Sequence, residues 1–152
     1  MSLKLSELIA IVLAALVAGM FSGPWAALSR SMHDFTPEFF LAIVDRMNRN
    51  MAAAMTPLMP ASLLSIVPVL ALTWNTQPRT FYLNLAGLAS FLLALLITVL
   101  VEVPIVQQIV AWTVPTLPPN WQQLRDRWSA FHLIRVAAGL AGLIFLVGGA
   151  IF

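Results

Sequence analysis

Four long apolar stretches divide the chain, and each has the length of a helix that crosses a membrane. Such a helix takes about 20 mainly apolar residues. The pattern therefore predicts four spans, over residues 5–32, 51–74, 80–108 and 131–152. Prolines fall inside the first two spans, and membrane helices tolerate them where neighbouring helices satisfy the freed carbonyl groups. We expect kinks at Pro24 and around Pro57 and Pro60.

The polar connections between these spans differ in length. Residues 75–80 form a short turn, whereas the first and third connections are long. In the first connection, Thr36 is a suitable N-cap and Pro37 a suitable first helical residue, which predicts an amphipathic helix over 37–50. In the third, a helix over 119–130 is expected to continue into the fourth span. Both long connections follow odd-numbered spans, so they lie on one side of the membrane and both termini lie on the other.

The composition agrees with a membrane protein. The chain has 152 residues, of which 61% are hydrophobic and 9% are charged, whereas a soluble domain has about 25% charged residues. So few charges cannot cover a water-exposed surface, and most of the surface must therefore face the lipid bilayer. The predicted fold is all-α: a single transmembrane domain, residues 1–152, built as an integral membrane four-helix bundle with amphipathic interfacial helices in the two long same-side connections.

Several kinds of chemistry are excluded. The chain has no cysteine, so it has no disulfide, no thiolate chemistry and no Cys-ligated zinc or iron–sulfur centre. Its basic residues occur singly, so nucleic acid is not an expected partner. The first apolar stretch follows Lys4, as in a signal peptide, but it is longer than a signal core of about 7–15 residues. We expect it to be retained as a span.

The basic residues also predict an orientation, because Lys and Arg concentrate on the cytoplasmic side of membrane proteins. The opposite side carries only Lys4 and Arg79, whereas the long-connection side carries Arg30, Arg46, Arg49, Arg125, Arg127 and Arg135. This bias predicts cytoplasmic long connections and external termini in the inner (plasma) membrane of a bacterium. An arginine that lines a functional pocket, however, does not report on orientation.

One face of the fourth predicted helix combines aromatic, cationic and small residues. Its positions advance by alternate steps of four and three residues, which keeps them on one side of an α-helix. The face contains Trp121, Arg125, Trp128, His132, Arg135, Gly139, Gly142, Leu146 and Gly149. Glycines let another helix backbone approach closely, so the face is predicted to point into the bundle and to place His132 and Arg135 in a pocket. The alternative is that Arg135 extends along its aliphatic stem to the lipid headgroups.

Glu102 is the only carboxylate that we expect in the interior of a span, and it lies on the same membrane side as His132. Ionisable groups at such depth are costly and usually face a partner or a wet cavity. We therefore expect Glu102 to pair with Arg135 or His132, with Gln108 less than two turns further along. The pair serves either as a structural lock between the third and fourth spans or in acid–base chemistry.

Further polar residues are candidates for the same site, at the end of the bundle where the long connections lie. Asn48 is the one polar member of an apolar helix face, where it hydrogen-bonds a ligand or ties its helix to the fourth span. Arg30, at the end of the first span, is another candidate, whereas His33 is expected to be a solvated loop histidine. The two histidines lack a local ligand spacing, so no metal site is predicted. A haem or metal held through His132 is left as an alternative.

The order of these features resembles a known family. The matching pieces are Gly19-Met-Phe-Ser-Gly23, Met47-Asn48, Val103-Pro104-Ile105 and Arg125-x-Arg127-Trp128-x-x-x-His132-x-x-Arg135. They resemble the domain-of-unknown-function family DUF1772, which includes anthrone oxygenase-like small integral membrane proteins. The resemblance implies a four-span bundle and, for some relatives, oxidation of polycyclic anthrones to anthraquinones with dioxygen and without a recognised metal or flavin. This chain differs from the family pattern in having Glu102 where an asparagine is common.

These residues are compatible with such chemistry, because a cofactor-free oxygenase needs a base and a cation that stabilises the resulting anion. The predicted function is a membrane-embedded, cofactor-independent oxygenase-like protein that acts on a hydrophobic aromatic or quinone-like ligand. Its predicted catalytic residues are His132, Arg135 and Glu102, and its predicted substrate-binding residues are Trp128, Arg125, Trp121, Asn48, Gln108 and Arg30. The alternatives are a non-catalytic accessory or ligand-binding subunit and a haem- or metal-binding redox protein. Small-residue faces on the first and fourth spans also permit a homo-oligomer.

Overall fold

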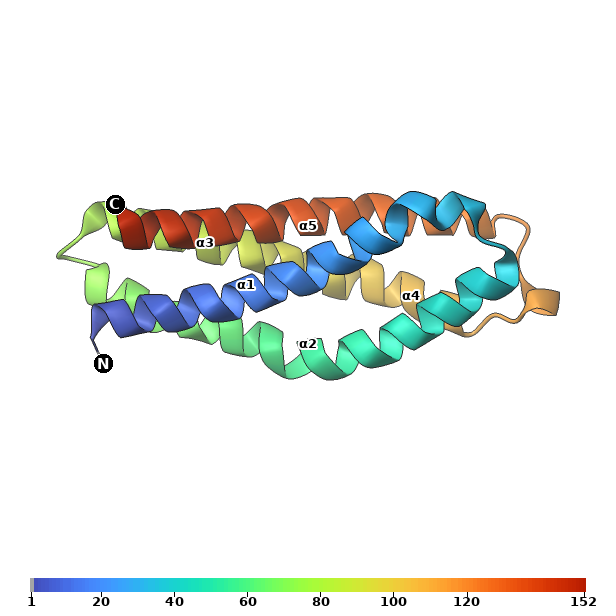
Figure 1. Cartoon of the computed structure of the whole chain (residues 1–152), viewed down its shortest axis with the longest axis horizontal. Coiled ribbons are helices and arrows are strands. Elements are labelled where there is room, and N and C mark those ends of the chain that lie inside the picture. The colour runs from blue at the N-terminus through green and yellow to red at the C-terminus, as the bar shows by residue number, and fades with distance from the viewer. Residues whose placement is uncertain (1) are drawn as a thin grey trace.

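A computed structural model describes residues 2–152, without the side chain of Arg30, and all regular structure in that range is helical. Four helical rods run antiparallel with both termini at one end (Figure 1). They are α1 (Leu3–Ala27), α2 (Pro37–Thr73), α3 (Pro78–Ile97) extended by the π-helical turn η2 (Thr98–Glu102) and α4 (Val103–Val110), and α5 (Trp121–Ile151). Each rod is long and apolar enough to cross a membrane. The predicted all-α four-helix bundle is confirmed.

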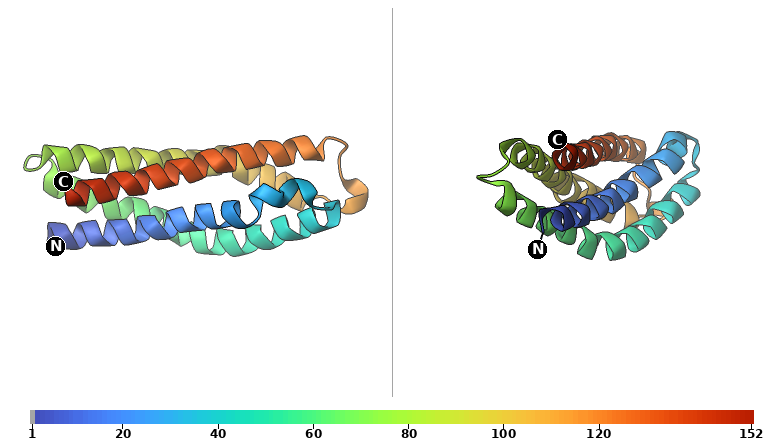
Figure 2. Two further views of the ribbon diagram at one scale, coloured as in Figure 1. Left: turned by 45° about the horizontal axis from the view of Figure 1, so that its top comes forward. Right: turned by 60° about the vertical axis from the view of Figure 1, so that its left-hand side comes forward.

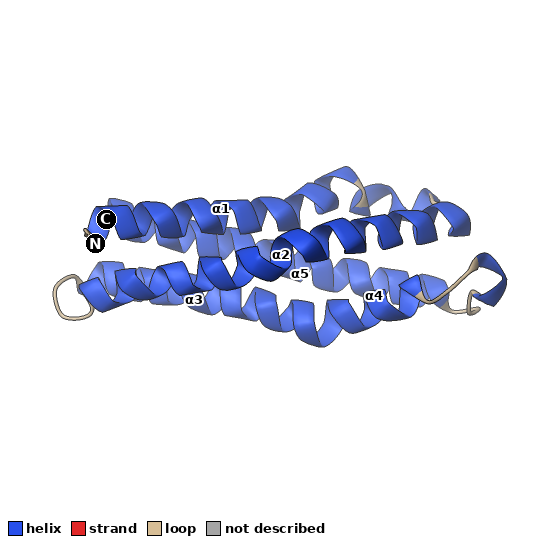
Figure 3. Cartoon of the chain, turned by 90° about the horizontal axis from the view of Figure 1, so that it is seen from below, coloured by secondary structure: helices blue, strands red, loops and turns tan. Residues whose placement is uncertain are grey.

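The rods form a ring in the order α1, α2, α3 and α5. The last helix packs against α3 and α1, and α2 packs against α1 and α3, as two further views show (Figure 2). Loops occur only at the two ends of the bundle (Figure 3). The short turn between α2 and α3 lies at the end with the termini, and the two 3₁₀ turns, η1 (Ser29–Asp34) and η3 (Val114–Thr116), lie at the other end.

The helix boundaries differ from the expected ones in the first half of the chain. The first helix ends at Ala27 and not near residue 32, and the chain tightens into the 3₁₀ turn Ser29–Asp34. The expected helices 37–50 and 51–74 form one continuous helix, α2. Its start matches the expectation, since Thr36 accepts a hydrogen bond from the Phe39 N–H at 3.4 Å. Nothing between Asn50 and Met51 breaks the helix, and α2 bows outward in its middle (Figure 1).

The third rod contains a turn that the apolar pattern did not indicate. Over Thr98–Glu102 the helix widens to π geometry, and the Val103 N–H bonds to the carbonyl oxygen of Thr98, five residues back. Pro104 follows at once, at the start of α4. Because proline has no N–H and its ring crowds the preceding turn, one bond of the regular α-helical ladder is missing there. Turns of this kind are frequent at functional sites.

Two apolar clusters fill the bundle. The membrane core includes Val17, Phe21, Ile66, Phe91, Ala94 and Leu146. The end core, near the long connections, consists of Met32, Phe40, Val44, Ile105, Ile109 and Trp128. Within the membrane core α3 and α5 approach closely, because an added Cβ at Gly142 would lie 2.8 Å from the Phe91 ring and 3.2 Å from the Gly87 oxygen. The glycine face of α5 is thus buried in the bundle.

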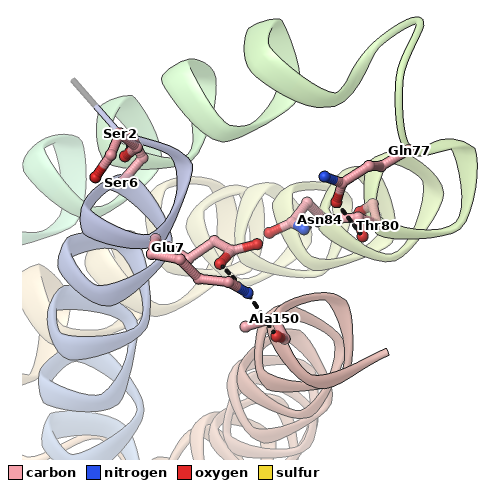
Figure 4. A network of polar contacts seen from close by, with 8 residues as sticks. Ser2, Ser6, Glu7, Gln77, Thr80, Asn84 and Ala150 are labelled. Carbon is pink, nitrogen blue, oxygen red and sulfur yellow. Dashed lines mark hydrogen bonds and ion pairs between the residues drawn. The ribbon is translucent and has the colours of Figure 1, made fainter.

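A second buried carboxylate lies at the terminal end of the bundle, although we expected Glu102 to be the only one inside a span. Glu7 is 4% exposed, and its carboxylate lies 3.1 Å from the ammonium group of Lys4. Lys4 also donates to the Ala150 carbonyl oxygen at 3.1 Å, which ties α1 to the end of α5 (Figure 4). The nearby Asn84 side chain donates to the Thr80 carbonyl oxygen at 2.8 Å. This network closes the end of the bundle that lies opposite the long connections.

Candidate functional site

A cavity of about 160 Å³ lies where the membrane core meets the end core. An apolar cavity of about 150 Å³ in another protein takes up benzene, so this one is large enough for an aromatic ring. Its lining residues are mostly apolar. Five of them are methionines, which have adaptable side chains: Met20, Met32, Met47, Met51 and Met55. The polar groups among its described lining residues belong to Asn48, Thr98, Glu102, Trp128, His132 and Arg135.

Three ionisable side chains meet at one wall of this cavity. Glu102 is 3% exposed and His132 is 1% exposed. Arg135 forms an ion pair with the Glu102 carboxylate and also donates to the Thr98 hydroxyl at 3.2 Å. The Nδ1 atom of His132 lies 3.4 Å from Glu102 Oε1 and 2.7 Å from an Arg135 nitrogen. The expected pairing of Glu102 therefore occurs with Arg135, and His132 lies beside the pair.

The contact between Arg135 and His132 indicates how the imidazole is protonated. A guanidinium group can only donate hydrogen bonds, so the 2.7 Å contact requires a lone pair on His132 Nδ1. A neutral ring then carries its proton on Nε2, an atom that is buried and has no hydrogen-bond partner. Glu102 Oε1 is also buried without a hydrogen bond. Of the two groups considered as a base, the carboxylate is therefore the one with a free acceptor atom.

Aromatic rings hold the charged group in place. The Trp128 ring stacks on His132 with a centroid distance of 5.3 Å and an interplanar angle of 15°. The Arg135 guanidinium itself lies 4.6 Å from the centroid of the Phe21 ring, which comes from α1. Such cation–π contacts strengthen when they are removed from water. The arrangement thus presents one paired cation at the wall of an apolar cavity.

Local helix geometry explains why these residues meet. Residues three and four apart share a helix face, which brings Trp128, His132 and Arg135 to the same side of α5. The π turn of the third rod turns both of its end residues, Thr98 and Glu102, toward that side. We did not expect Thr98 or Phe21 in the site. Thr98 lies four residues before Glu102 within the predicted span 80–108, so its helical spacing was a usable signal.

Several of the predicted site residues are not found at the cavity. Trp121 and Arg125 do not line the cavity: the Arg125 guanidinium donates to Asp126 at 2.9 Å and contacts His33 Nδ1 at 3.0 Å. The Trp121 ring packs against the end core, with its centroid 5.3 Å from that of Phe40. Gln108 is exposed and does not line the cavity either, and the Arg30 side chain lies outside the described part of the structure. His33 is exposed, but it contacts Arg125 and is therefore not simply solvated.

The described side chains include no group of three or more His, Cys, Asp or Glu that could hold a metal ion. At the cavity wall the third member of the cluster is the Arg135 cation, which lies against His132 Nδ1. A metal needs the deprotonated nitrogen or oxygen atoms that this cation occupies. A metal or haem held through His132 stays an untested alternative.

A comparison with known families bears on the whole arrangement. The family model described as anthrone oxygenase matches residues 46–145, from the first half of α2 to the second half of α5. The match includes Asn48, Glu102, His132 and Arg135. No curated protein and no solved structure matches the chain. Because the family model covers well over half of the sequence, the resemblance noted above is confirmed, and the chain belongs to the anthrone oxygenase family.

Proposed function

We propose that this protein is a membrane-embedded oxygenase that needs no cofactor and oxidises a hydrophobic aromatic substrate of the anthrone or hydroquinone type. The observation that supports this best is the buried cluster of Glu102, Arg135 and His132 at the wall of an apolar, methionine-rich cavity. A substrate that is poorly soluble in water needs apolar walls, and an enolate or phenolate intermediate needs a nearby cation. The cavity combines both features.

The proposed reaction assigns one role to each residue. Glu102 takes a proton from the substrate carbon, and the Arg135 guanidinium stabilises the negative charge that then develops on the substrate oxygen. The carbanion of the anthrone reacts with dioxygen to give a peroxide anion, which takes the proton back from Glu102 and becomes a hydroperoxide. This loses water, so that a methylene group becomes a carbonyl, one oxygen atom enters the product and the other leaves as water. His132 contacts and orients the Arg135 guanidinium, and the Trp128 ring stacks on the His132 imidazole.

Oxygen uptake with an anthrone as substrate tests this proposal. Glu102→Gln should lower the rate by about 100-fold or more, which is the usual contribution of a general base. Glu7→Gln removes the other buried carboxylate, at the far end of the bundle, and should leave the rate unchanged. The proposal would be contradicted if the native protein consumed no oxygen. It would also be contradicted if the Glu102→Gln variant consumed oxygen at the native rate. A colourless preparation with no bound metal would support the absence of a cofactor.

One observation favours a second function, ligand binding without catalysis. The Arg135 charge is already neutralised by Glu102, so the pair also fits a lock between α5 and the third rod. A non-catalytic protein would bind a quinone-like ligand with an affinity that is indifferent to dioxygen. Binding without oxygen uptake would therefore favour this second function.

A further inference from the structure

The exposure of its lining residues shows on which side the cavity opens. Of the described residues that line it, three are exposed: Asn48 and Ala52 on α2, and Val103 on α4. The other lining residues, including those from α1 and α5, are buried or half-buried. The opening therefore lies sideways, between α2 and α4, and not along the axis of the bundle.

The wall beside this opening is thinly packed. Between Val44 and Met59, a stretch described throughout, α2 has no buried residue. In this region the inner face of α2 consists of half-buried methionines, Met47 and Met51 among them, that line the cavity. The segment corresponds to the outward bow of α2 (Figure 1). Low packing density is typical of parts that open at small cost in free energy.

The surroundings of the opening change from apolar to charged along the bundle axis. On the third rod, Val99 is 53% exposed, Leu100 is 68% exposed and Val103 is 41% exposed, so this side offers an apolar surface. On α2, Asp45 and Arg49 form an exposed ion pair within two turns of Ala52, toward the long connections. Apolar surface followed by charges is the pattern expected where the hydrocarbon core gives way to the headgroups. The opening thus lies at that boundary.

We propose that the gap between α2 and α4 is a lateral entrance, through which a flat ring compound dissolved in the membrane reaches Arg135. Asn48 is the hydrogen-bonding residue at its mouth. The choice of a ring compound rests on the proposed function. An oxygen atom at the leading edge of the ring would accept from Arg135 and Thr98, whereas the buried end of a lipid acyl chain carries no acceptor. The ligand would never have to cross bulk water.

The absence of cysteine allows this entrance to be blocked reversibly. In Ala52→Cys, the new thiol is joined through a disulfide to a bulky aromatic label. The matched control is Ala53→Cys, which places the same label one residue away, at an exposed position that does not line the cavity. Both proteins are placed in phosphatidylcholine vesicles and mixed with a naphthoquinone. Binding is followed by quenching of tryptophan fluorescence, and Trp128→Phe identifies the part that comes from the cavity.

The label at position 52 should slow association by about tenfold or more. It should slow dissociation as well, because an obstructed entrance hinders passage in both directions. Reduction of the disulfide should restore both rates, and the labelled Ala53→Cys protein should behave as the unlabelled one. Unchanged rates for labelled Ala52→Cys, equal slowing in the control, or faster dissociation would overturn the entrance while ligand binding stands. Quenching that does not depend on Trp128 would overturn the proposed ligand and the entrance together.

Discussion

Two opposite charges that are buried side by side, as Glu102 and Arg135 are, each lose several kcal/mol of hydration, and only good geometry offsets that loss. Removing one member of a buried pair leaves the other without compensation. Replacing both members with apolar residues of similar volume is often neutral or stabilising. The pair therefore gives a way to separate a contribution to stability from a contribution to chemistry.

We predict that Glu102→Leu and Arg135→Met each destabilise the bundle by about 3–5 kcal/mol, whereas the double variant recovers the native stability. Unfolding followed by circular dichroism in detergent measures this difference. If the pair serves chemistry, the double variant should be stable and consume no oxygen with an anthrone. A stable double variant that retains oxygen uptake would show that neither residue is needed for the reaction.

At the scale of residues, the sequence predicted the pairing and the inward face of α5. The pairing followed from topology, since the end of the third span and the start of the fourth lie on the same side. The inward face is buried from Arg125 to Gly149, and its part from Trp128 to Arg135 lines the cavity. Trp121 and Arg125 do not reach the cavity, because helical spacing alone does not show where the Phe40 side chain fills the bundle. The tautomer of His132 depends on a contact that no spacing can indicate.

At the scale of elements, the helix geometry of the third rod decides whether Glu102 meets Arg135. Each residue inserted into or removed from an α-helix rotates everything beyond it by about 100°. The π turn at Thr98–Glu102 sets the rotation of Glu102 relative to α3, and it could not be predicted because the apolar pattern of the third rod continues through it. Pro104 was visible in the sequence, but a proline predicts only an irregularity and not its kind.

Deletion of Leu100, an exposed residue within the π turn, should return the third rod to a regular helix and turn Glu102 away from Arg135. We expect a helical protein that has lost both oxygen uptake and quinone-dependent quenching of Trp128. Leu100→Ala is the control, because it removes the same side chain without changing the number of residues, and it should keep both properties. A deletion variant with native quenching would contradict the role assigned to the turn.

The contact between α3 and α5 supplies a prediction that is independent of the site. Gly142→Ala would place a Cβ 2.8 Å from Phe91 and 3.2 Å from the Gly87 oxygen, so the helices must separate. The bundle should lose about 1–3 kcal/mol of stability, as overpacked cores do. Gly19→Ala is the matched control: its Cβ meets nothing within 4 Å, so thermal unfolding should be unchanged. If both variants unfolded at the same temperature as the native protein, the close approach of α3 and α5 would not be required for stability.

The whole molecule is polar at both ends, and the cavity with the buried Glu102–Arg135 pair lies nearer to one of them. The terminal end is closed by the contacts among Lys4, Glu7 and the Ala150 carbonyl group (Figure 4). The long-connection end contains the cavity and most of the exposed charges. Since Arg135 is paired with Glu102 inside the bundle, it should not be counted in the charge bias. The bias persists without it, because Arg30, Arg46, Arg49, Arg125 and Arg127 remain on that side against Lys4 and Arg79.

This bias predicts that the long connections face the cytoplasm, so that the lateral entrance lies in the cytoplasmic leaflet. Asn75 lies in the short turn at the terminal end, and Asn120 precedes α5 at the other end; both are exposed. Because the chain has no cysteine, Asn75→Cys and Asn120→Cys each provide a single thiol for a membrane-impermeant maleimide. In spheroplasts the label should react at position 75 at once and at position 120 only after permeabilisation. The reverse pattern would place the entrance in the outer leaflet, which a substrate made in the cytoplasm reaches only after it has crossed the bilayer.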